Sequence, residues 1–258
     1  MEELAPAPVR PLALVTGVGR RVGIGAAIAT RLALDGWDVA ISYWAPYDDR
    51  LPWSSAPDEI DQIAEALRTA GARTIAVQDD LSDVAAAGRI FDAVEAELGR
   101  VTALVMCHCE SVDSSLLDTS VASFDAHFAV NARGSWLLIQ EFANRFTGEV
   151  GAGRILALTS DATVGNMPYG ASKGALDRIV MAAARELASH GITANVINPG
   201  PVDTGWISDE LRASIVAASP QHRVGQPRDT AALVSFLCSG DGGWVNGQLL
   251  HSDGGLHT

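Results

Sequence analysis

The chain has 258 residues, of which 48% are hydrophobic and 19% are charged, so it can bury a large core and is not globally disordered. Its 31 acidic residues outnumber its 18 Lys and Arg, and the net charge of -13 disfavours binding to nucleic acid or to an anionic membrane. Three cysteines are too few for a disulfide framework. The N-terminus, MEELAPAPVRP, has no signal-peptide pattern, and no apolar run is long enough to cross a bilayer. We therefore expect a globular cytoplasmic protein without nucleic-acid or membrane partners.

Short apolar runs alternate with longer segments of helical period along the chain. Strands are predicted at residues 12–16, 38–43, 74–77, 103–106, 154–158, 193–197 and 248–251. Helices are predicted at residues 24–34, 58–70, 84–98, 123–146, 169–190 and 209–218. This alternation predicts an α/β, single-domain Rossmann-type doubly wound fold, with a mostly seven-stranded parallel sheet flanked by helices.

Two longer stretches interrupt the alternation. Residues 44–57 are rich in proline and aromatic residues, and residues 201–223 contain only one short predicted helix. Both follow the carboxyl ends of predicted strands, where such sheets bind ligands, so we interpret them as lids or binding loops, with plain surface loops as the alternative. Because no composition break divides the chain, residues 1–258 are expected to form one domain, with residues 1–10 as a flexible N-terminal tail.

A glycine-rich segment, TGVGRRVGIG at residues 16–25, follows the first predicted strand and opens the first predicted helix. Glycines allow a close approach to a pyrophosphate, and the free amides of a helix start attract its charge. The second predicted strand ends in Ser42-Tyr43-Trp44, without the carboxylate that would hold an unphosphorylated ribose. Arg20 and Arg21 instead offer guanidinium groups that suit a 2′-phosphate. NADP(H) is therefore favoured over NAD(H), unless both arginines face solvent.

Tyr169 and Lys173 are four residues apart, so on a helix they share one face. A phenol with its ordinary pKa of about 10 is a poor acid or base near neutrality. A neighbouring ammonium group is expected to lower that pKa and to suit Tyr169 to general acid–base catalysis. Ser160, at the end of the preceding strand, can donate a hydrogen bond to a substrate carbonyl and polarise it for hydride attack.

Through these motifs, the chain resembles the short-chain dehydrogenase/reductase family over essentially its whole length. The other matching elements are Asp80-Leu81, Asn131, Asn198-Pro199-Gly200-Pro201 with Thr204, Gly247-Gln248 and Asp253-Gly254-Gly255. The resemblance implies Tyr169 as proton donor, Lys173 as ribose binder and pKa tuner, and Ser160 as holder of the carbonyl. It also implies that Asn131 anchors a water-linked proton relay.

The resemblance and the glycine loop together predict the nucleotide-binding residues. These are Gly17, Gly19, Arg20, Arg21, Gly23, Ile24, Tyr43, Trp44, Asp80, Leu81, Cys107, Tyr169, Lys173, Pro199, Gly200, Val202 and Thr204. Within the family the sequence looks nearest to 3-oxoacyl-[acyl-carrier-protein] reductase-like members, which implies a homo-oligomer, either a dimer or a tetramer. No metal site is expected.

Three features depart from the family pattern. The glycine loop has two extra residues between Gly17 and Gly23, as in a subgroup of the family. Ser160 and Tyr169 are only nine positions apart, a shortening that can move the serine out of register. Met106-Cys107-His108-Cys109 stands in place of the family's Asn-Asn-Ala-Gly, which helps to shape the cofactor cleft.

Several side chains admit more than one interpretation. The Cys107-His108-Cys109 segment suits zinc, but we favour small, soft residues packed beside the cofactor. His127 is one helical turn from Asn131 and is interpreted as a structural histidine. One predicted helix has an apolar face made of Trp136, Leu137, Ile139 and Phe142. We expect this face to pack either against a second subunit or inside its own subunit.

Two functions follow from these residues. The first is an NADP(H)-dependent oxidoreductase that interconverts a small-molecule ketone and a secondary alcohol by hydride transfer. The second is a dinucleotide-binding sensor or structural protein with little or no catalysis, which the altered 106–109 segment and the short 160–169 spacing motivate.

Overall fold

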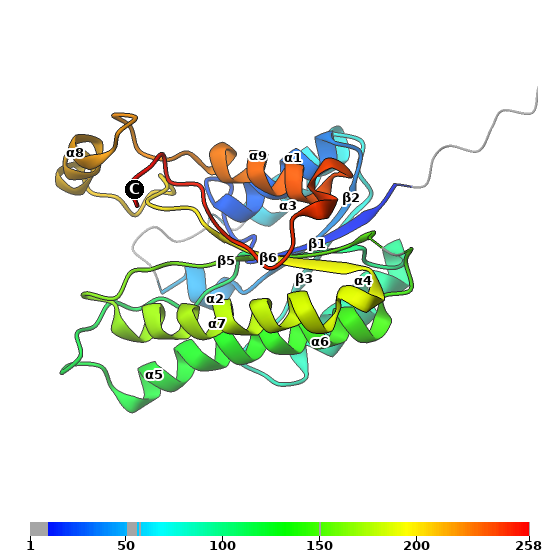
Figure 1. The fold of residues 1–258 in the computed structure, drawn as a ribbon, viewed down its shortest axis with the longest axis horizontal. Helices are drawn as coiled ribbons and strands as arrows, with labels where there is room; N and C mark the ends of the chain where they lie inside the picture. The colour runs from blue at the N-terminus through cyan, green and yellow to red at the C-terminus, as the bar shows by residue number, and fades with distance from the viewer. Residues whose placement is uncertain (1–9, 51–55, 57, 150, 258) are drawn as a thin grey trace, which may run out of the picture.

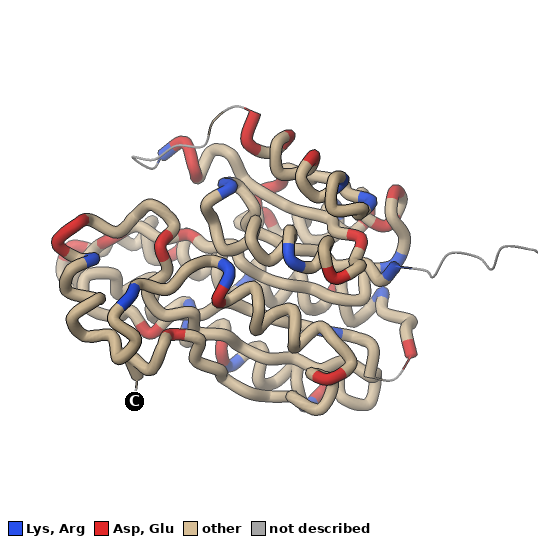
Figure 2. The backbone as a smooth tube through the Cα atoms, turned by 90° about the horizontal axis from the view of Figure 1, so that it is seen from above, with Lys and Arg blue, Asp and Glu red and all other residues tan. Residues whose placement is uncertain are grey.

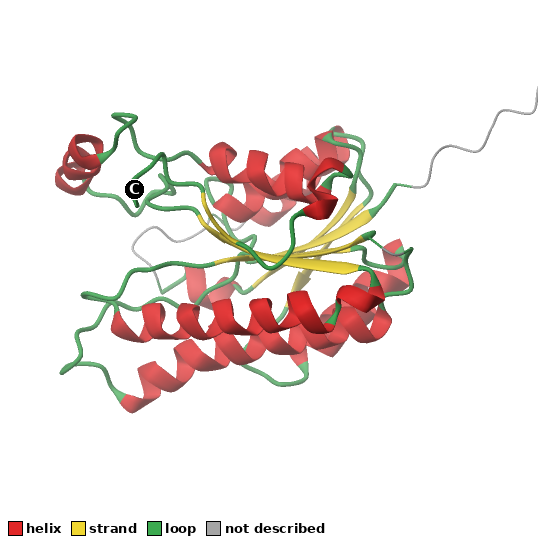
Figure 3. Ribbon diagram, viewed as in Figure 1, coloured by secondary structure: helices red, strands yellow, loops and turns green. Residues whose placement is uncertain are grey.

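The protein folds as a parallel β-sheet between two layers of helices (Figures 1 and 3). The computed structural model describes residues 10–50, 56, 58–149 and 151–257. Within these ranges no helix is both long enough and apolar enough to span a membrane. The expected flexible tail lies outside the described residues except for Arg10, which is anchored: its Nη2 donates to the carbonyls of Ala33 and Trp37, each at 2.8 Å.

The sheet contains seven strands in the order β3-β2-β1-β4-β5-β6-β7, and every neighbouring pair is parallel. Their bounds are β1 Leu12–Thr16, β2 Asp38–Tyr43, β3 Thr74–Gln78, β4 Ala103–Met106, β5 Gly153–Leu158, β6 Ile192–Asn198 and β7 Leu249–His251. The predicted strands are confirmed, with ends that differ by at most one residue. The order reverses between β1 and β4, and the crevice at such a switch point is where doubly wound sheets bind ligands.

Helices cover both faces of the sheet, as predicted. One layer holds α1 Ile24–Leu34, α3 Glu59–Thr69 and α9 Pro227–Cys238, and the other holds α4 Ala86–Leu98, α6 Ser135–Arg145 and α7 Met167–Glu186 (Figure 1). Shorter helices are α2 Ala45–Asp48, α5 Val121–His127 and α8 Asp209–Ala218, and 3-10 turns occur at Ala188–His190 and Asp241–Trp244. Helix α9 was not among the predicted helices, although Pro227 in its first turn is a typical start signal.

Burial explains why the central strands β1, β4 and β5 are rich in apolar residues. Along β1, Leu12 and Leu14 enter the core on one face, whereas Ala13 and Val15 enter the core on the other. Side chains of successive strand residues point to opposite faces, so a strand covered on both sides needs a continuous apolar run.

The predicted helix at 123–146 is continuous but not regular. Helix α5 passes into a π-helical segment, Phe128–Gly134, and then into α6. In a π segment the backbone hydrogen bonds span one residue more than in an α-helix, and such segments often mark functional sites. Asn131 lies within it and is fully buried.

The charges of the protein are interspersed. Figure 2 shows Lys and Arg scattered along the chain among Asp and Glu. Many of the arginines are paired, for example Arg73 with Asp38 at 2.7 Å and Arg145 with Glu141 at 2.8 Å.

Candidate active site

A cleft of about 1390 Å³ opens at the carboxyl ends of the strands. Its walls come from the segments that follow β1, β2, β3, β4, β5 and β6, together with the start of α7. Both long excursions contribute to it, through Trp44, Pro46 and Tyr47 on one side and Pro201, Val202 and Trp206 on the other. The described parts of both excursions therefore line the cleft, and residues 51–55 and 57 lie outside the described residues. Their action as lids stays a prediction.

The glycine loop forms one end of this cleft. Gly17 has a φ of 71°, and a Cβ there would stand 2.5 Å from the backbone of His108, so only glycine lets β1 turn this close to the segment after β4. Gly23 precedes α1 with extended backbone and makes no side-chain cap, which leaves amides of the first helical turn facing the loop. This arrangement suits a pyrophosphate.

The side chains of the two neighbouring arginines in the loop have different surroundings. Arg20 lines the cleft, where its Nη1 donates to the Thr204 carbonyl at 3.0 Å. The Arg21 guanidinium instead donates to Gln62 on α3 at 2.5 Å, and Arg21 does not line the cleft. Arg20 therefore lies in the cleft, whereas Arg21 anchors the loop to α3.

A carboxylate that the sequence analysis did not assign to the site also enters the cleft. Asp48, at the end of α2, pairs with Arg20 across 3.6 Å between Oδ1 and Nε. Burial raises the pKa of Asp48, and the Arg20 charge partly opposes that shift. The fold of the 44–50 segment brings Asp48 back to the glycine loop, and no local sequence pattern encodes this approach.

All of the remaining predicted nucleotide-binding residues line the cleft. They are Gly17, Gly19, Gly23, Ile24, Tyr43, Trp44, Asp80, Leu81, Cys107, Tyr169, Lys173, Pro199, Gly200, Val202 and Thr204. Of the predicted catalytic residues, Ser160 lines it as well, whereas Asn131 lies behind its wall.

Ser160 and Tyr169 meet in the cleft despite their short separation. Their side chains share a hydrogen bond. The connection fits because a Cβ at Gly170 would stand 2.0 Å from the Ala162 carbonyl oxygen, so the loop after β5 rests directly on the first turn of α7. The shortened loop therefore leaves the serine in register with the tyrosine.

Lys173 lies one turn further along α7 and is buried. Its Nζ donates to the carbonyls of Leu158 at 2.9 Å and His108 at 3.4 Å, and it stands 5.7 Å from the centre of the Tyr169 ring. Burial lowers the pKa of Lys173. The ammonium group thus holds the ends of β4 and β5 together beneath the tyrosine.

The pKa of Tyr169 differs from the sequence-based expectation. Burial raises this pKa above its ordinary value, with Cys109 adding to the rise and the Ser160 hydrogen bond opposing it. The expected lowering by Lys173 is therefore wrong for this arrangement, because desolvation of the buried phenol sets the direction of the shift. The phenol is protonated near neutrality and holds the proton that a donor must supply.

Asn131 is tied into the framework beside the cleft. Its Oδ1 accepts from the Glu110 amide at 2.7 Å, and its Nδ2 donates to the Glu110 carbonyl and to Ser172 Oγ, each at 2.9 Å. Asn131 thus links the π segment to the loop after β4 and to α7. Its part in a water-linked relay stays a prediction.

The unusual 106–109 segment is built around a buried histidine. His108 Nδ1 lies 2.7 Å from Thr16 Oγ1, and its Nε2 lies 3.1 Å from Ser135 Oγ. Burial, followed by the charge of Lys173, lowers the pKa of His108 to about 3, so the ring is neutral. Both ring nitrogens have partners inside the protein, which argues against zinc at Cys107-His108-Cys109.

The two thiols of this segment face the cleft. Burial raises the pKa of both, to about 12 for Cys107, so both are neutral. This agrees with our preferred interpretation of small, soft side chains packed at the cofactor wall.

Two other interpretations are resolved by the structure. His127 is fully buried, accepts from the Val112 amide at 3.0 Å and contacts the Ser123 carbonyl, so it is structural. On the apolar helix face, Ile139 and Phe142 are buried within the subunit, whereas Trp136 is 47% exposed. The face is therefore packed internally for the most part.

The fold and the cleft define a doubly wound dinucleotide-binding protein with a Ser-Tyr-Lys set beside its nucleotide loop. The family described as Enoyl-(Acyl carrier protein) reductase matches residues 17–257. The chain belongs to the short-chain dehydrogenase/reductase family and is an oxidoreductase of this type.

Related proteins and solved structures are similar to this chain over nearly its full length. An uncharacterized oxidoreductase, YjdA of Bacillus subtilis, is 34% identical over 95% of this chain and 96% of its own. An NADPH-dependent aldehyde reductase-like chloroplastic protein of Arabidopsis thaliana is 37% identical over 95% of this chain and 93% of its own. A short-chain dehydrogenase of Burkholderia cenocepacia, solved in complex with NADP, superimposes with a TM-score of 0.86 at 32% identity, over 98% of this chain and 100% of its own.

Proposed function

We propose that the protein is an NADP(H)-dependent oxidoreductase that interconverts a carbonyl compound, in our interpretation a ketone, and the corresponding alcohol. The observation that carries this proposal is the hydrogen bond between Ser160 and Tyr169 in the cleft, above the buried ammonium of Lys173. A protein that only binds the dinucleotide has no need of a proton donor at this position.

The residues divide the chemistry among them. NADPH, when bound, supplies a hydride from C4 of its nicotinamide. Ser160 donates a hydrogen bond to the substrate oxygen and stabilises the negative charge that develops there. Tyr169 gives its phenolic proton to that oxygen, and Lys173 stabilises the phenolate that remains. In the oxidation direction the phenolate takes the proton back.

Replacing Ser160 with alanine is expected to lower kcat by about 10²- to 10³-fold, because one donor to the developing oxyanion is lost. Steady-state kinetics with NADPH and a reducible carbonyl measures this. Ser115→Ala, on an exposed loop, is the matched control and should leave kcat unchanged. Equal rates for the Ser160 variant and the wild type would remove the serine from the mechanism.

The preference for NADP(H) is supported by Arg20 in the cleft and by the relatives whose names include NADPH or NADP. Arg20→Ala is expected to raise the Kd for NADPH by about 10- to 100-fold and to change that for NADH far less, because a charge-assisted contact with the 2′-phosphate is lost. Arg21→Ala should change the NADPH affinity little, since Arg21 is directed to α3. Fluorescence titration with both nucleotides checks this. A uniform loss for both nucleotides in the Arg20 variant would contradict the assignment.

The substrate belongs to the proposal as well. A panel of ketones, aldehydes and 3-oxoacyl thioesters tests the predicted ketone and 3-oxoacyl-[acyl-carrier-protein] reductase-like activities alongside the aldehyde chemistry for which the Arabidopsis relative is named. The alternative, a sensor with little catalysis, predicts NADPH binding without oxidation by any member of the panel.

A homo-oligomer, dimer or tetramer, also remains our expectation. Trp244 is 99% exposed and Phe236 on α9 is 44% exposed, and a second copy would cover such side chains. Sedimentation analysis of the full chain measures the state directly.

A further inference from the structure

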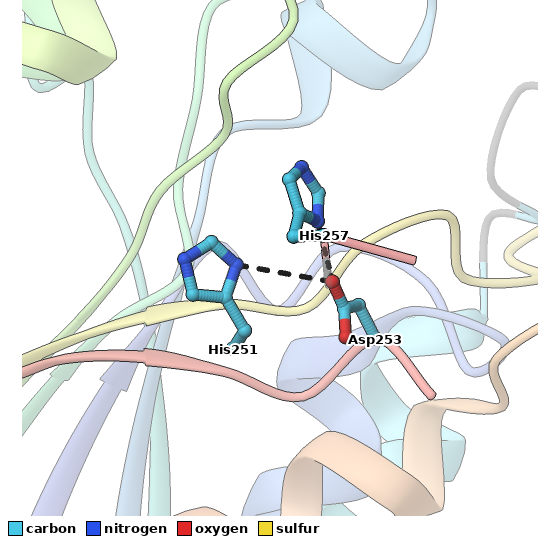
Figure 4. Close-up of side chains that lie close together, drawn as sticks. All are labelled: His251, Asp253 and His257. Atoms are coloured by element: carbon cyan, nitrogen blue, oxygen red, sulfur yellow. Dashed lines mark hydrogen bonds and ion pairs between the residues drawn. The ribbon is translucent and has the colours of Figure 1, made fainter. Parts of the chain in front are cut away.

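The segment after β7 returns to the cleft and places three metal-ligating side chains together. His251 ends β7, and Asp253 and His257 follow it in the spacing H-x-D-x-x-x-H. In Figure 4 the two imidazole rings flank the Asp253 carboxylate. The ring centres lie 4.8 Å apart, and the Asp253 side chain is only 5% exposed.

The potential donor atoms lie close to one another. His251 Nδ1 stands 3.8 Å from Asp253 Oδ2, and His257 Nδ1 contacts the same oxygen. One donor atom from each residue can be chosen so that all lie within 4.8 Å of one another. Tetrahedral ligands about 2 Å from a common ion are about 3.3 Å apart, so side-chain rotations that bring the most distant donor atoms closer by about 1.5 Å enclose one.

A fourth residue orients this group. The other nitrogen of His257, Nε2, contacts the Asp161 carboxylate, which comes from the loop after β5. Histidines that bind a metal through one nitrogen commonly donate the other N–H to a carboxylate, which fixes the ring and raises its basicity. Asp161 stands in that relation to His257.

We propose that His251 Nδ1, Asp253 Oδ2 and His257 Nδ1 bind a divalent transition-metal ion, with Asp161 as the positioning carboxylate behind His257. Two imidazoles and one carboxylate suit Zn²⁺, Co²⁺ or Ni²⁺ better than Mg²⁺ or Ca²⁺, which prefer oxygen ligands throughout. The proposal departs from the sequence-based expectation of no metal site. It goes beyond the proposed reduction and does not require a nucleotide.

The position of the site gives the ion a role. Asp161 directly follows Ser160, and both Asp161 and His257 line the cleft. A bound ion fastens the C-terminal segment to the loop that carries the catalytic serine. The ion is thus a positioning element at the wall of the cleft, and not a participant in hydride transfer.

Calorimetric titration of Zn²⁺ into the EDTA-treated full chain tests the proposal. One equivalent per chain is expected to bind, and His251→Gln, Asp253→Asn and His257→Gln should each weaken binding by at least about 10-fold. Asp161→Asn should weaken it by about 10- to 100-fold, as the loss of an outer carboxylate does. His190→Gln, an exposed residue before β6, is the matched control and should bind as the wild type does.

Two outcomes overturn the proposal. One is the absence of Zn²⁺ binding by the wild-type chain. The other is binding that survives Asp253→Asn but is lost in Cys107→Ser/Cys109→Ser, which would assign the metal to the thiols. Absorption of the Co²⁺-loaded chain distinguishes these ligand sets without any activity assay. Nitrogen and oxygen ligands predict visible d–d bands without thiolate-to-cobalt charge transfer, and a strong charge-transfer band would contradict the assignment.

Discussion

Replacing Tyr169 with phenylalanine is expected to lower kcat by about 10²- to 10⁴-fold, the range that a positioned general acid contributes. The ring that packs beside Lys173 is retained, so the Kd for NADPH should stay close to that of the wild type. Because burial keeps the phenol protonated, loss of the hydroxyl removes the proton that the substrate oxygen requires. Steady-state kinetics and fluorescence titration on the same preparation measure the two effects separately.

The same cleft provides a matched control. Tyr47 also lines it and bonds to Cys109, so Tyr47→Phe removes a phenolic hydroxyl from the same environment. Its effect on kcat should be far smaller than that of Tyr169→Phe. Comparable losses in the two variants, or full turnover in Tyr169→Phe, would contradict the role of Tyr169.

The second large effect concerns stability at acidic pH. His108 has a pKa of about 3 in the folded protein, against about 6.5 for an ordinary histidine. Below pH 6.5 the unfolded chain therefore binds a proton at this residue that the folded chain excludes. The stability associated with neutral, buried His108 is complete above about pH 6.5 and is lost as the pH falls toward about 3. From about pH 7 to about pH 4.5 this amounts to about 3 kcal/mol of unfolding free energy.

His108→Asn removes this titration and should flatten the decline of stability with falling pH. An amide can still bond to Thr16, but the bond to Ser135 is lost, so we expect a cost of about 1 kcal/mol at neutral pH. Urea unfolding at a series of pH values measures both changes. His190→Gln, which alters an exposed histidine, should keep the wild-type slope, and an unchanged slope in His108→Asn would refute the assignment.

The central strands β1, β4 and β5 could be predicted closely from the sequence because they are covered on both faces. Such strands must be continuous apolar runs, and Leu12–Thr16 shows this directly. The glycine loop was equally clear, since a turn that brings Gly17 against the His108 backbone admits no side chain. These features are local or nearly local, and local patterns encode them.

Features that depend on long-range approach were not predictable. The sequence gives Arg20 and Arg21 the same local setting, but only the fold directs one to the cleft and the other to α3. Likewise, Asp48 reaches the glycine loop through the path of the 44–50 segment. The π segment around Asn131 forms where its side chain bonds to the Glu110 backbone, a contact made across separate elements.

The pKa of Tyr169 was predicted with the wrong sign for a related reason. Residue types and spacing reveal the charge of Lys173 but not the burial around the phenol, and burial is the larger effect here. The sequence did contain the H-x-D-x-x-x-H spacing of the C-terminal segment. Its significance depends on Asp161, which is distant in sequence and adjacent only in the fold.

Transfer of deuterium from [4-²H₂]NADPH to a carbonyl substrate tests the central account most directly. The wild-type chain is expected to place one deuterium on the carbinol carbon of the product, with the hydroxyl proton supplied through Tyr169. Tight binding of the labelled nucleotide without deuterium in any product of the carbonyl panel would contradict the account and favour a dinucleotide-binding protein without catalysis.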